Sequence, residues 1–382
     1  MEPSNHLPPV RPEFENHESD VVYSKHMKLK KIGKWIADHK KITIPIAVII
    51  ISLICVGVFM LITGSEETVE RTEIPEETEE AEPAKTTVPS PLTGVEVKPK
   101  LAERPVTAVM IENSPDARPQ SGLDQAGLVF EAIAEGGITR FVALYQEGQP
   151  KRIGPVRSAR PYYIDWVVTF DASYAHVGGS AQALAQIKKL GVKDLDQFFN
   201  PNTYERSADR FAPHNVYTDF KRLDDLNKQK GFKNSKFEII PRKEPAPSPS
   251  PKATKISIPI SSPLYDVKYE YDKGANNYKR YVGGLPHNDA ESGKVIRPSV
   301  VVVMTTTNGL HSDGQHMVYD LEGTGAVKIF QDGLVYKGIW KKSGRSSMIK
   351  FENNKGDTIE LNPGMVWITA QSPDKTTTWK AN

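Results

Sequence analysis

The chain has 382 residues, a length that allows two ordinary domains with extensions. Its 49 basic and 47 acidic residues give a formal net charge of +2, so the total charge favours no class of charged partner. The single cysteine, Cys55, excludes a disulfide framework and a thiolate metal cluster within the chain.

The first 41 residues predict a basic cytoplasmic tail. Residues 1–24 are polar and rich in proline without apolar periodicity, which indicates disorder. Residues 25–41 carry seven lysines together with Trp35. Two interpretations of this block stay open: a short helix lying on anionic lipid headgroups, or a solvated flank that only sets the membrane topology.

Residues 42–62 contain no charged side chain and predict a transmembrane helix. As a helix, this segment spans roughly 30 Å at ~1.5 Å per residue, the thickness of a bilayer's hydrocarbon core. No small-residue cleavage site follows, and Ile54 precedes Cys55 where lipoprotein signals carry a small residue, so we expect an uncleaved anchor. The lysines before it predict a cytoplasmic N-terminus, with the bulk of the chain outside the cell membrane.

The next segment, residues 63–91, predicts an acidic, disordered stalk. Residues 66–82 hold nine glutamates and almost no large apolar side chain, so this stretch repels itself and cannot bury enough surface to fold. Globular composition follows, and we place an N-terminal domain at 92–240 and a C-terminal domain at 254–382. Between them, residues 241–253 are rich in proline and serine and predict either a linker or a long surface loop.

The N-terminal domain combines strands with two later helices. The first helix covers 181–190, with Ser180 as its N-cap and Gly191 as its C-cap, and the second covers 216–229 with Thr218 as its cap. Apolar runs bounded by turns predict five strands: 106–111, 128–134, 138–146, 164–170 and 173–177.

The C-terminal domain predicts mainly antiparallel β-structure, which makes the fold class of the exported part α+β. Turns at 331–333 and 354–357 separate the later apolar runs at hairpin spacing. The expected strands are 256–260, 265–271, 278–282, 299–305, 325–331, 334–341, 348–351 and 365–369.

Several long blocks of this sequence occur in one known family, in the same order. They are RPQSGLDQAGLVFEAIAEGGITRFVALYQ, RIGPVRSARPYYIDW and YAHVGGS, followed by RYVGGLPHND, GAVKIFQDGLVYKGIWKK and IELNPGMVWI. With these blocks, residues 92–382 resemble the YerB-like family of bacterial envelope proteins. The resemblance implies a layered β/β/α arrangement and an extracytoplasmic location in Gram-positive-type bacteria. Members of that family have no established activity, and many resemble lipoproteins.

Three arginines, Arg152, Arg157 and Arg160, surround a Gly-Pro turn. Because guanidinium groups pair bidentately with planar oxyanions, this cluster predicts a site for a carboxylate or phosphate of an envelope polymer. The alternative is internal pairing that fastens loops to the sheet. Its acidic partners would then be Glu112, Glu131, Glu135 or Asp165.

His176 and Ser180 flank Gly178 and Gly179, where a strand is expected to end and a helix to begin. Such a turn can expose a nucleophilic hydroxyl. The spacing differs from the G-x-S-x-G elbow, however, and a serine before a helix is an ordinary N-cap. Both residues are ligand-binding candidates, and we expect His176 rather than Ser180 to act in a pocket.

His214, His287 and Asp289 complete the ligand-binding candidates. The histidines are scattered and lack the i, i+4 spacing of a zinc helix, so we expect neither a metal site nor a cofactor. A polar pocket built from Arg157, His176, His287 and Asp289 is the arrangement that we expect if the two domains meet there.

The sequence favours a membrane-anchored extracellular binding or scaffolding protein of the bacterial envelope, with wall polymers or envelope proteins as partners. The alternative is a hydrolase or transferase acting on an anionic envelope substrate, with the arginines as an anion clamp and His176 as general base. Nucleic acid is not an expected partner. Membrane topology explains the one basic block, and the exported part lacks a glycine-rich phosphate loop followed by lysine.

Overall fold

The computed structural model describes residues 39, 41, 51–53 and 86–381. The chain divides into two compact units, Met1–Ala81 and Glu82–Asn382, and the second holds all the strands described below. The predicted cytoplasmic tail, transmembrane helix 42–62 and most of the stalk lie outside the described residues. In the part of the chain that is described, no helix is long and apolar enough to cross a membrane.

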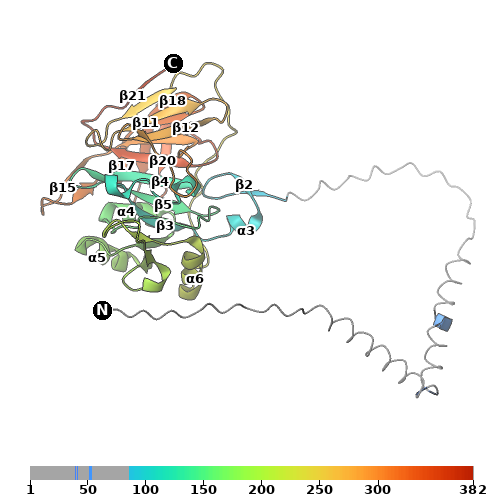
Figure 1. Ribbon diagram of the computed structural model, residues 1–382. Coiled ribbons are helices and arrows are strands. Elements are labelled where there is room, and N and C mark those ends of the chain that lie inside the picture. Colours follow the sequence, from blue (N-terminus) through green and yellow to red (C-terminus); the bar gives the residue numbers. More distant parts are fainter. Residues whose placement is uncertain (1–38, 40, 42–50, 54–85, 382) are drawn as a thin grey trace, which may run out of the picture. The chain divides into compact units, whose positions relative to one another are not determined.

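A ten-stranded mixed sheet forms the centre of this second unit (Figure 1). Its strands follow the order β19-β18-β17-β14-β20-β4-β5-β3-β6-β7. Strands of both predicted domains share this sheet, because β20 pairs in parallel with β14 on one side and β4 on the other. Their bounds are β3 Thr107–Glu112, β4 Leu128–Glu135, β5 Ile138–Tyr145, β6 Ser173–His176, β7 Lys193–Asp196, β14 Val300–Thr305, β17 Gly323–Gln331, β18 Leu334–Lys342, β19 Lys350–Asn353 and β20 Val366–Gln371.

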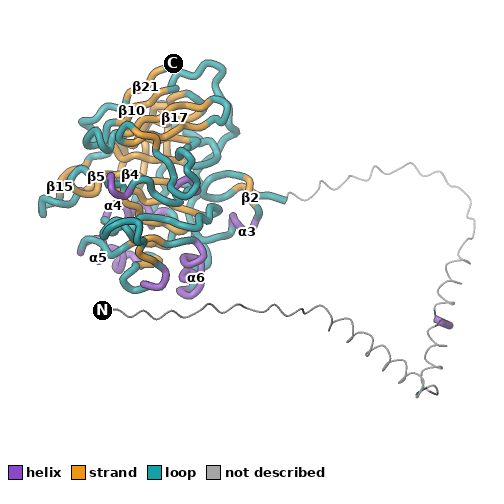
Figure 2. Tube along the Cα trace, viewed as in Figure 1, coloured by secondary structure: helices purple, strands orange, loops and turns teal. Residues whose placement is uncertain are grey.

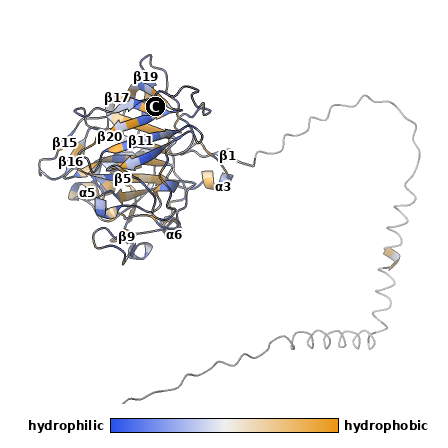
Figure 3. Ribbon diagram, turned by 45° about the horizontal axis from the view of Figure 1, so that its top comes forward, coloured by the Kyte–Doolittle hydropathy of each residue, from blue (hydrophilic) through white to orange (hydrophobic). Residues whose placement is uncertain are grey.

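A second, antiparallel sheet has five strands in the order β13-β12-β11-β10-β21. Buried positions alternate with more exposed ones along β10, β11 and β12, which indicates one face on the core and one toward solvent. Figure 3 colours the unit by hydropathy, and its strands carry both hydrophobic and hydrophilic residues. The bounds are β10 Lys255–Ile258, β11 Val267–Asp272, β12 Asn277–Val282, β13 Leu285–Pro286 and β21 Thr378–Lys380.

The helices are few and gather toward the end of the unit that carries β3 (Figure 2). They are α3 Pro99–Ala102, α4 Pro161–Thr169, α5 Ala181–Leu190 and α6 Phe220–Lys230, with short 3-10 turns at Pro115–Ala117, Leu123–Gln125 and Pro201–Thr203. Three two-stranded ribbons complete the unit: β1 Val88–Pro89 with β2 Glu96–Val97, β8 Glu205–Arg206 with β9 Val216–Tyr217, and β15 Asn308–Leu310 with β16 Met317–Tyr319. The predicted α+β class is confirmed.

Both faces of the ten-stranded sheet are covered. Along β3, Ala108 and Met110 point into a core with α4 and α5, whereas Val109 and Ile111 point to the opposite face and meet α6. Along β14, Val301 packs against the five-stranded sheet on that same opposite face. The central strands are therefore buried on both sides, which explains why they are nearly continuous apolar runs.

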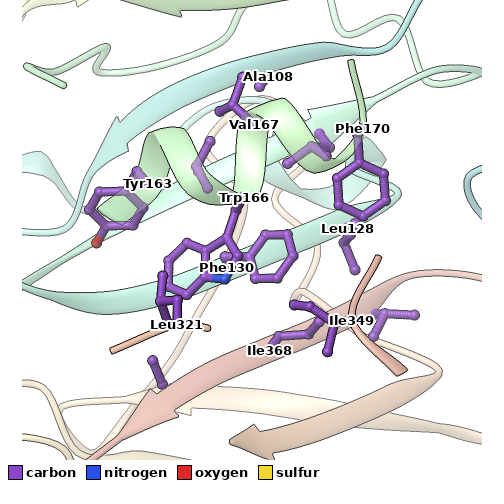
Figure 4. Close-up of a cluster of buried hydrophobic side chains, with 14 of the residues drawn as sticks. Ala108, Leu128, Phe130, Tyr163, Trp166, Val167, Phe170, Leu321, Ile349 and Ile368 are labelled. Carbon is purple, nitrogen blue, oxygen red and sulfur yellow. The ribbon is translucent and has the colours of Figure 1, made fainter. Parts of the chain in front are cut away.

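The prediction of a strand at 164–170 is wrong: residues 164–169 belong to helix α4, and Phe170 is its C-cap. Pro161 occupies the first turn of the helix, where its missing N–H costs nothing. Trp166 stacks on Phe130 with ring centroids 4.7 Å apart and an interplanar angle of 8° (Figure 4). Because α4 is buried on most sides, its apolar run lacks the helical period and resembles a buried strand.

The two predicted helices both form. Ser180 Oγ accepts a hydrogen bond from Ala183 N at 3.3 Å, and Gly191 closes α5 at a φ of +62°, as predicted. The cap of α6 was predicted wrongly. Asp219 rather than Thr218 caps this helix, since Asp219 Oδ1 accepts from Arg222 N at 2.8 Å, and the preceding residues form β9 instead.

Residues 241–253 contain no helix or strand, and they lie against the body of the unit. Lys243 Nζ lies 2.5 Å from Asp332 Oδ2, and Ser248 N donates to the Asp332 carbonyl at 3.0 Å. Asp332 also accepts from Asn276 and Asn362, so one buried carboxylate holds this segment to both sheets. Burial acts to raise the pKa of this carboxyl, but these bonds outweigh it and lower the pKa.

Candidate functional site

The carboxyl ends of three neighbouring parallel strands meet at one edge of the ten-stranded sheet. Strand β6 pairs in parallel with both β3 and β7, and the three strands end at Glu112, His176 and Asp196. The antiparallel neighbour β5 adds Arg140, which lies opposite Glu112. Open α/β sheets bind ligands at this edge. In this protein, several charged side chains lie there.

Two arginines of this edge are closed by internal partners. Arg160 donates from Nε and Nη2 to Glu135 at 3.0 and 2.9 Å and from Nη1 to the Ala159 carbonyl at 2.8 Å. Arg140 binds the same Glu135 carboxylate and the Ser158 carbonyl. The alternative of internal pairing therefore describes Arg160, whose hydrogen bonds fasten the start of α4 to the end of β4.

Arg157 is different, because its guanidinium keeps unused donors. Its Nε lies 3.3 Å from Glu112 Oε1, and this ion pair is the one contact of the guanidinium in the described part of the chain. The contact is too poorly aligned to count as a hydrogen bond. The side chain remains 25% exposed, so Arg157 has both the charge and the access to meet an external anion.

Glu112 is the buried centre of this site. Its side chain is 4% exposed and lies between Arg157 and His214, whose Nδ1 is 3.0 Å from Glu112 Oε2. Ser114 Oγ donates to Glu112 Oε1 at 3.1 Å. We call Glu112, Ser114, Arg157 and His214 the edge cluster. The pairing of Glu112 Oε2 with His214 is close in distance but lacks hydrogen-bond alignment, so this buried oxygen has no full partner.

The edge cluster does not have the geometry of a catalytic triad. His214 Nδ1 faces both Glu112 Oε2, at 3.0 Å, and Ser114 Oγ, at 3.3 Å. A triad needs the carboxylate and the nucleophile on opposite ring nitrogens, so that the proton can pass through the ring. The arrangement instead presents a cation beside a buried carboxylate, which is suited to binding a charged group.

His176, predicted to contact a ligand, is fully buried with both ring nitrogens occupied. Its Nδ1 lies 2.7 Å from the Gly178 carbonyl and its Nε2 lies 3.1 Å from Asp194 Oδ1. The general base expected for a hydrolase therefore has no free nitrogen facing solvent. Ser180 caps α5, so its hydroxyl is also engaged.

His287 and Asp289 lie in separate surroundings from the edge cluster. His287 is 2% exposed, with Nδ1 2.6 Å from Arg280 Nη1 and Nε2 2.8 Å from Gln120 Oε1. Asp289 Oδ1 accepts two backbone N–H bonds and shapes a turn. The structure thus does not join Arg157, His176, His287 and Asp289 in one pocket.

Arg152 connects loops near the same edge. Its guanidinium lies 4.1 Å from the centroid of the Tyr217 ring, and its nitrogens are 3.6 Å from Asp209 and 3.8 Å from Glu291. Arg152 is thus held by a cation–π contact and two long ion pairs. Within the described ranges, no group of three or more His, Cys, Asp or Glu residues could hold a metal ion.

Residue patterns missed two members of the edge cluster as site residues. Glu112 was expected only as a pairing partner, and Ser114 was not a candidate. The sequence does hold a signal for Glu112, since it is the last residue of an apolar strand and precedes a turn, the position where a sheet edge presents polar groups.

Comparisons with known proteins agree on one family. The profile described as "Protein of unknown function (DUF3048) N-terminal domain" matches residues 92–233, and that of the C-terminal domain matches residues 256–368. The chain belongs to this YerB-like family. The "Putative lipoprotein YerB" of Bacillus subtilis (strain 168) is 34% identical over 286 residues, which cover 73% of this chain and 85% of that protein.

A solved structure shows the same fold. The crystal structure of YerB protein from Bacillus subtilis superposes with a TM-score of 0.69 at 31% identity. The superposition covers 76% of this chain and 99% of the chain in the crystal structure. The match confirms the predicted family, and with it the mixed, mostly β architecture of this YerB-like protein.

His287→Gln tests the buried surroundings of that residue. Burial, then the charges of Arg280 and Arg118, lower the pKa of His287 well below its ordinary value, so the folded protein keeps a neutral ring. The unfolded chain takes up a proton near pH 6.5, so the stability contributed by the neutral ring is complete above about pH 6.5 and falls below it. We expect the unfolding free energy of His287→Gln in urea to change less between about pH 7 and pH 5 than that of the wild type.

The difference between the two profiles isolates this group, because the carboxyl groups titrate equally in both proteins. The wild type should lose up to about 1.4 kcal/mol per pH unit more than the variant in this range. Parallel profiles would show that His287 is not held neutral in the folded state.

Proposed function

We propose that this YerB-like protein is a binding protein of the bacterial envelope, anchored in the membrane, that recognises an anionic group through the edge cluster. The observation that carries the proposal is Arg157, whose guanidinium keeps unused donors at the carboxyl edge of the parallel strands. Its planar fork matches a carboxylate or a phosphate, the groups of peptidoglycan and teichoic acids.

The surroundings of Arg157 favour binding over chemistry. The Glu112 carboxylate contacts Arg157 through one oxygen and His214 through the other. The side chains of the cluster are therefore held in place before any ligand binds. His176, the base that hydrolysis would require, is buried and bonded at both nitrogens. In the edge cluster, the carboxylate and the hydroxyl face the same nitrogen of His214, which does not suit a hydrolase or transferase of the triad type.

The anchor belongs to the proposal as well. The Bacillus subtilis relative carries the name "Putative lipoprotein YerB". In this chain we propose that residues 42–62 cross the membrane once, with the basic tail in the cytoplasm and residues 63–91 as a spacer outside. The unit that carries the edge cluster then faces the cell wall. We propose that its two sequence domains, 92–240 and 254–382, act there together.

Replacing Arg157 tests the binding site. Arg157→Lys keeps the charge but loses the planar fork, so we expect about tenfold weaker co-sedimentation of the purified full-length protein with peptidoglycan sacculi that carry their teichoic acids. Arg157→Ala should weaken it further. The melting temperature should stay near that of the wild type, because Arg157 makes one imperfect ion pair with the protein.

The matched control is Arg222→Lys on α6, since Arg222 is an exposed arginine paired with Glu205 and Asp219. It should sediment like the wild type. If Arg157→Lys bound as well as the control, or if Arg157→Ala melted far below the wild type, Arg157 would be a structural residue and the proposed function would fail.

A cysteine at Ser250 tests the topology. Ser250 is exposed in the 241–253 segment, and the native Cys55 is removed by Cys55→Ser. A thiol reagent that cannot cross membranes should label Ser250→Cys in intact cells as completely as in lysed cells. Labelling only after lysis would place this unit in the cytoplasm and contradict the orientation.

A further inference from the structure

The solvent face of the five-stranded sheet carries a concave, lysine-rich surface. Along β10 and β11 the buried side chains point to the core, and the alternate positions point outward. These outward residues surround a hollow of about 440 Å³ beside the edge strand β21. We call this surface the lysine face, and its outward residues are Lys255, Ser257, Lys268, Glu270, Thr378 and Lys380.

The register of the strands sets like charges against each other. Lys255 lies directly opposite Lys380 on β21, and opposite Glu270 on β11. Side chains directly opposite in an antiparallel pair have Cβ atoms about 5 Å apart, so the two ammonium groups repel one another and destabilise the pairing. An anion bound near both ammonium groups would reduce this repulsion and stabilise the edge of the sheet.

No carboxylate of the described residues forms an ion pair with these amines. Among the described residues, Lys255, Lys268 and Lys380 have no ion-pair partner within 4.0 Å. Glu270 accepts a hydrogen bond from Tyr281 at 3.0 Å, which draws its carboxylate toward β12. By contrast, Lys279 on the same face is paired with Asp272 at 3.7 Å. Within the described part of the chain, the three amines around the hollow are therefore cations without an ion-pair partner, and Glu270 is the one carboxylate beside them.

Two hydroxyl groups lie between the amines. Ser257 is opposite Thr378 on one side and Lys268 on the other, so one row across the strands holds two hydroxyls and an amine. The neighbouring row holds Lys380, Lys255 and then Glu270. Ammonium groups neutralise phosphate as point charges, and hydroxyls donate to its remaining oxygens. This combination suits a tetrahedral phosphate better than a single planar carboxylate.

We propose that the lysine face binds a linear phosphate polymer, which lies along the hollow with successive phosphates on Lys380, Lys255 and Lys268. A polymer strand can enter a concave surface and reach Ser257 and Thr378, whereas a flat membrane contacts only the rim. This site is distinct from the edge cluster. It lies on the other sheet and uses amines, where the edge cluster uses a guanidinium.

The probe for this site is inorganic polyphosphate, with neutral dextran as the uncharged comparison. The purified full-length protein should bind polyphosphate and not dextran, and binding should weaken steeply between about 50 and 200 mM salt, as expected for an electrostatic contact. Lys255→Gln and Lys380→Gln should each weaken binding about fivefold. In the absence of polyphosphate, Lys380→Gln should also raise the melting temperature, because it removes the repulsion with Lys255 and leaves Lys255 opposite Glu270.

Lys279→Gln is the matched control, since it removes a lysine of the same face that already has an acidic partner. It should bind polyphosphate within twofold of the wild type and gain no stability. The proposal is overturned if Lys255→Gln binds as the wild type does. It is also overturned if anionic phosphatidylglycerol vesicles bind through Lys255 while polyphosphate does not, which would make the face a membrane contact.

The proposals for the edge cluster and for the lysine face can be tested independently. Arg157→Lys should leave polyphosphate binding at the lysine face intact. Loss of polyphosphate binding in Arg157→Lys, with Lys255→Gln unaffected, would assign the phosphate polymer to the edge cluster and end the separate proposal.

Discussion

The ion pair between Glu131 and Arg280 is the interaction on which the rest of this fold depends. Arg280 Nη2 lies 2.6 Å from Glu131 Oε2, and both side chains are fully buried. Glu131 belongs to β4 of the ten-stranded sheet and Arg280 to β12 of the five-stranded sheet. Two charges removed from water are tolerated only when their remaining hydrogen-bonding groups are also satisfied.

The surrounding residues provide these hydrogen-bond partners. Trp367 Nε1 donates to Glu131 Oε2 at 2.9 Å, and Thr139 Oγ1 donates to Oε1 at 3.1 Å. The guanidinium of Arg280 lies 4.1 Å from the Trp367 ring centroid. Burial alone would lower the pKa of Arg280, but the charge of Glu131, together with Tyr269 and the hydrogen bonds to both, outweighs burial and raises the pKa, so the guanidinium stays charged. The pair therefore joins the two sheets through a closed polar network.

This network also positions the edge cluster. Arg280 contacts His287, which contacts Gln120, and Gln120 Nε2 in turn donates to the Glu112 carbonyl at 2.9 Å. The backbone that presents the Glu112 carboxylate to Arg157 is thus held by a chain of hydrogen bonds that begins in the other sheet. The ten-stranded and the five-stranded sheet therefore share one polar network, and the candidate site lies at its end.

Much of this could be predicted from local patterns. The caps of α5 are set by Ser180 and Gly191 and need no distant partner, and most central strands are recognisable as apolar runs. Helix α4 could not be separated from a strand, because burial on most sides removes its period. Strand β21 has three residues and depends on pairing with β10 far earlier in the chain.

The buried ion pair was missed for a different reason. An arginine within an alternating strand is usually assigned to solvent, yet Tyr278, Arg280 and Val282 occupy the same buried face of β12. The alternation along β12 places Arg280 on the buried face. Its acidic partner lies 149 residues away, however, and no local sequence pattern identifies that partner. A contact across a similar separation brings His214 to Glu112. The edge cluster could therefore not be predicted from local sequence patterns.

The most direct measurement of this account is the unfolding free energy of Arg280→Met in urea, compared with Arg297→Met. Arg280→Met leaves the buried Glu131 carboxylate without its cation, and we expect a loss of about 3–5 kcal/mol. Arg297 pairs with Asp272 at the surface, so its replacement should cost at most about 1 kcal/mol. Equal, small losses in the two variants would contradict the view that this pair holds the sheets together.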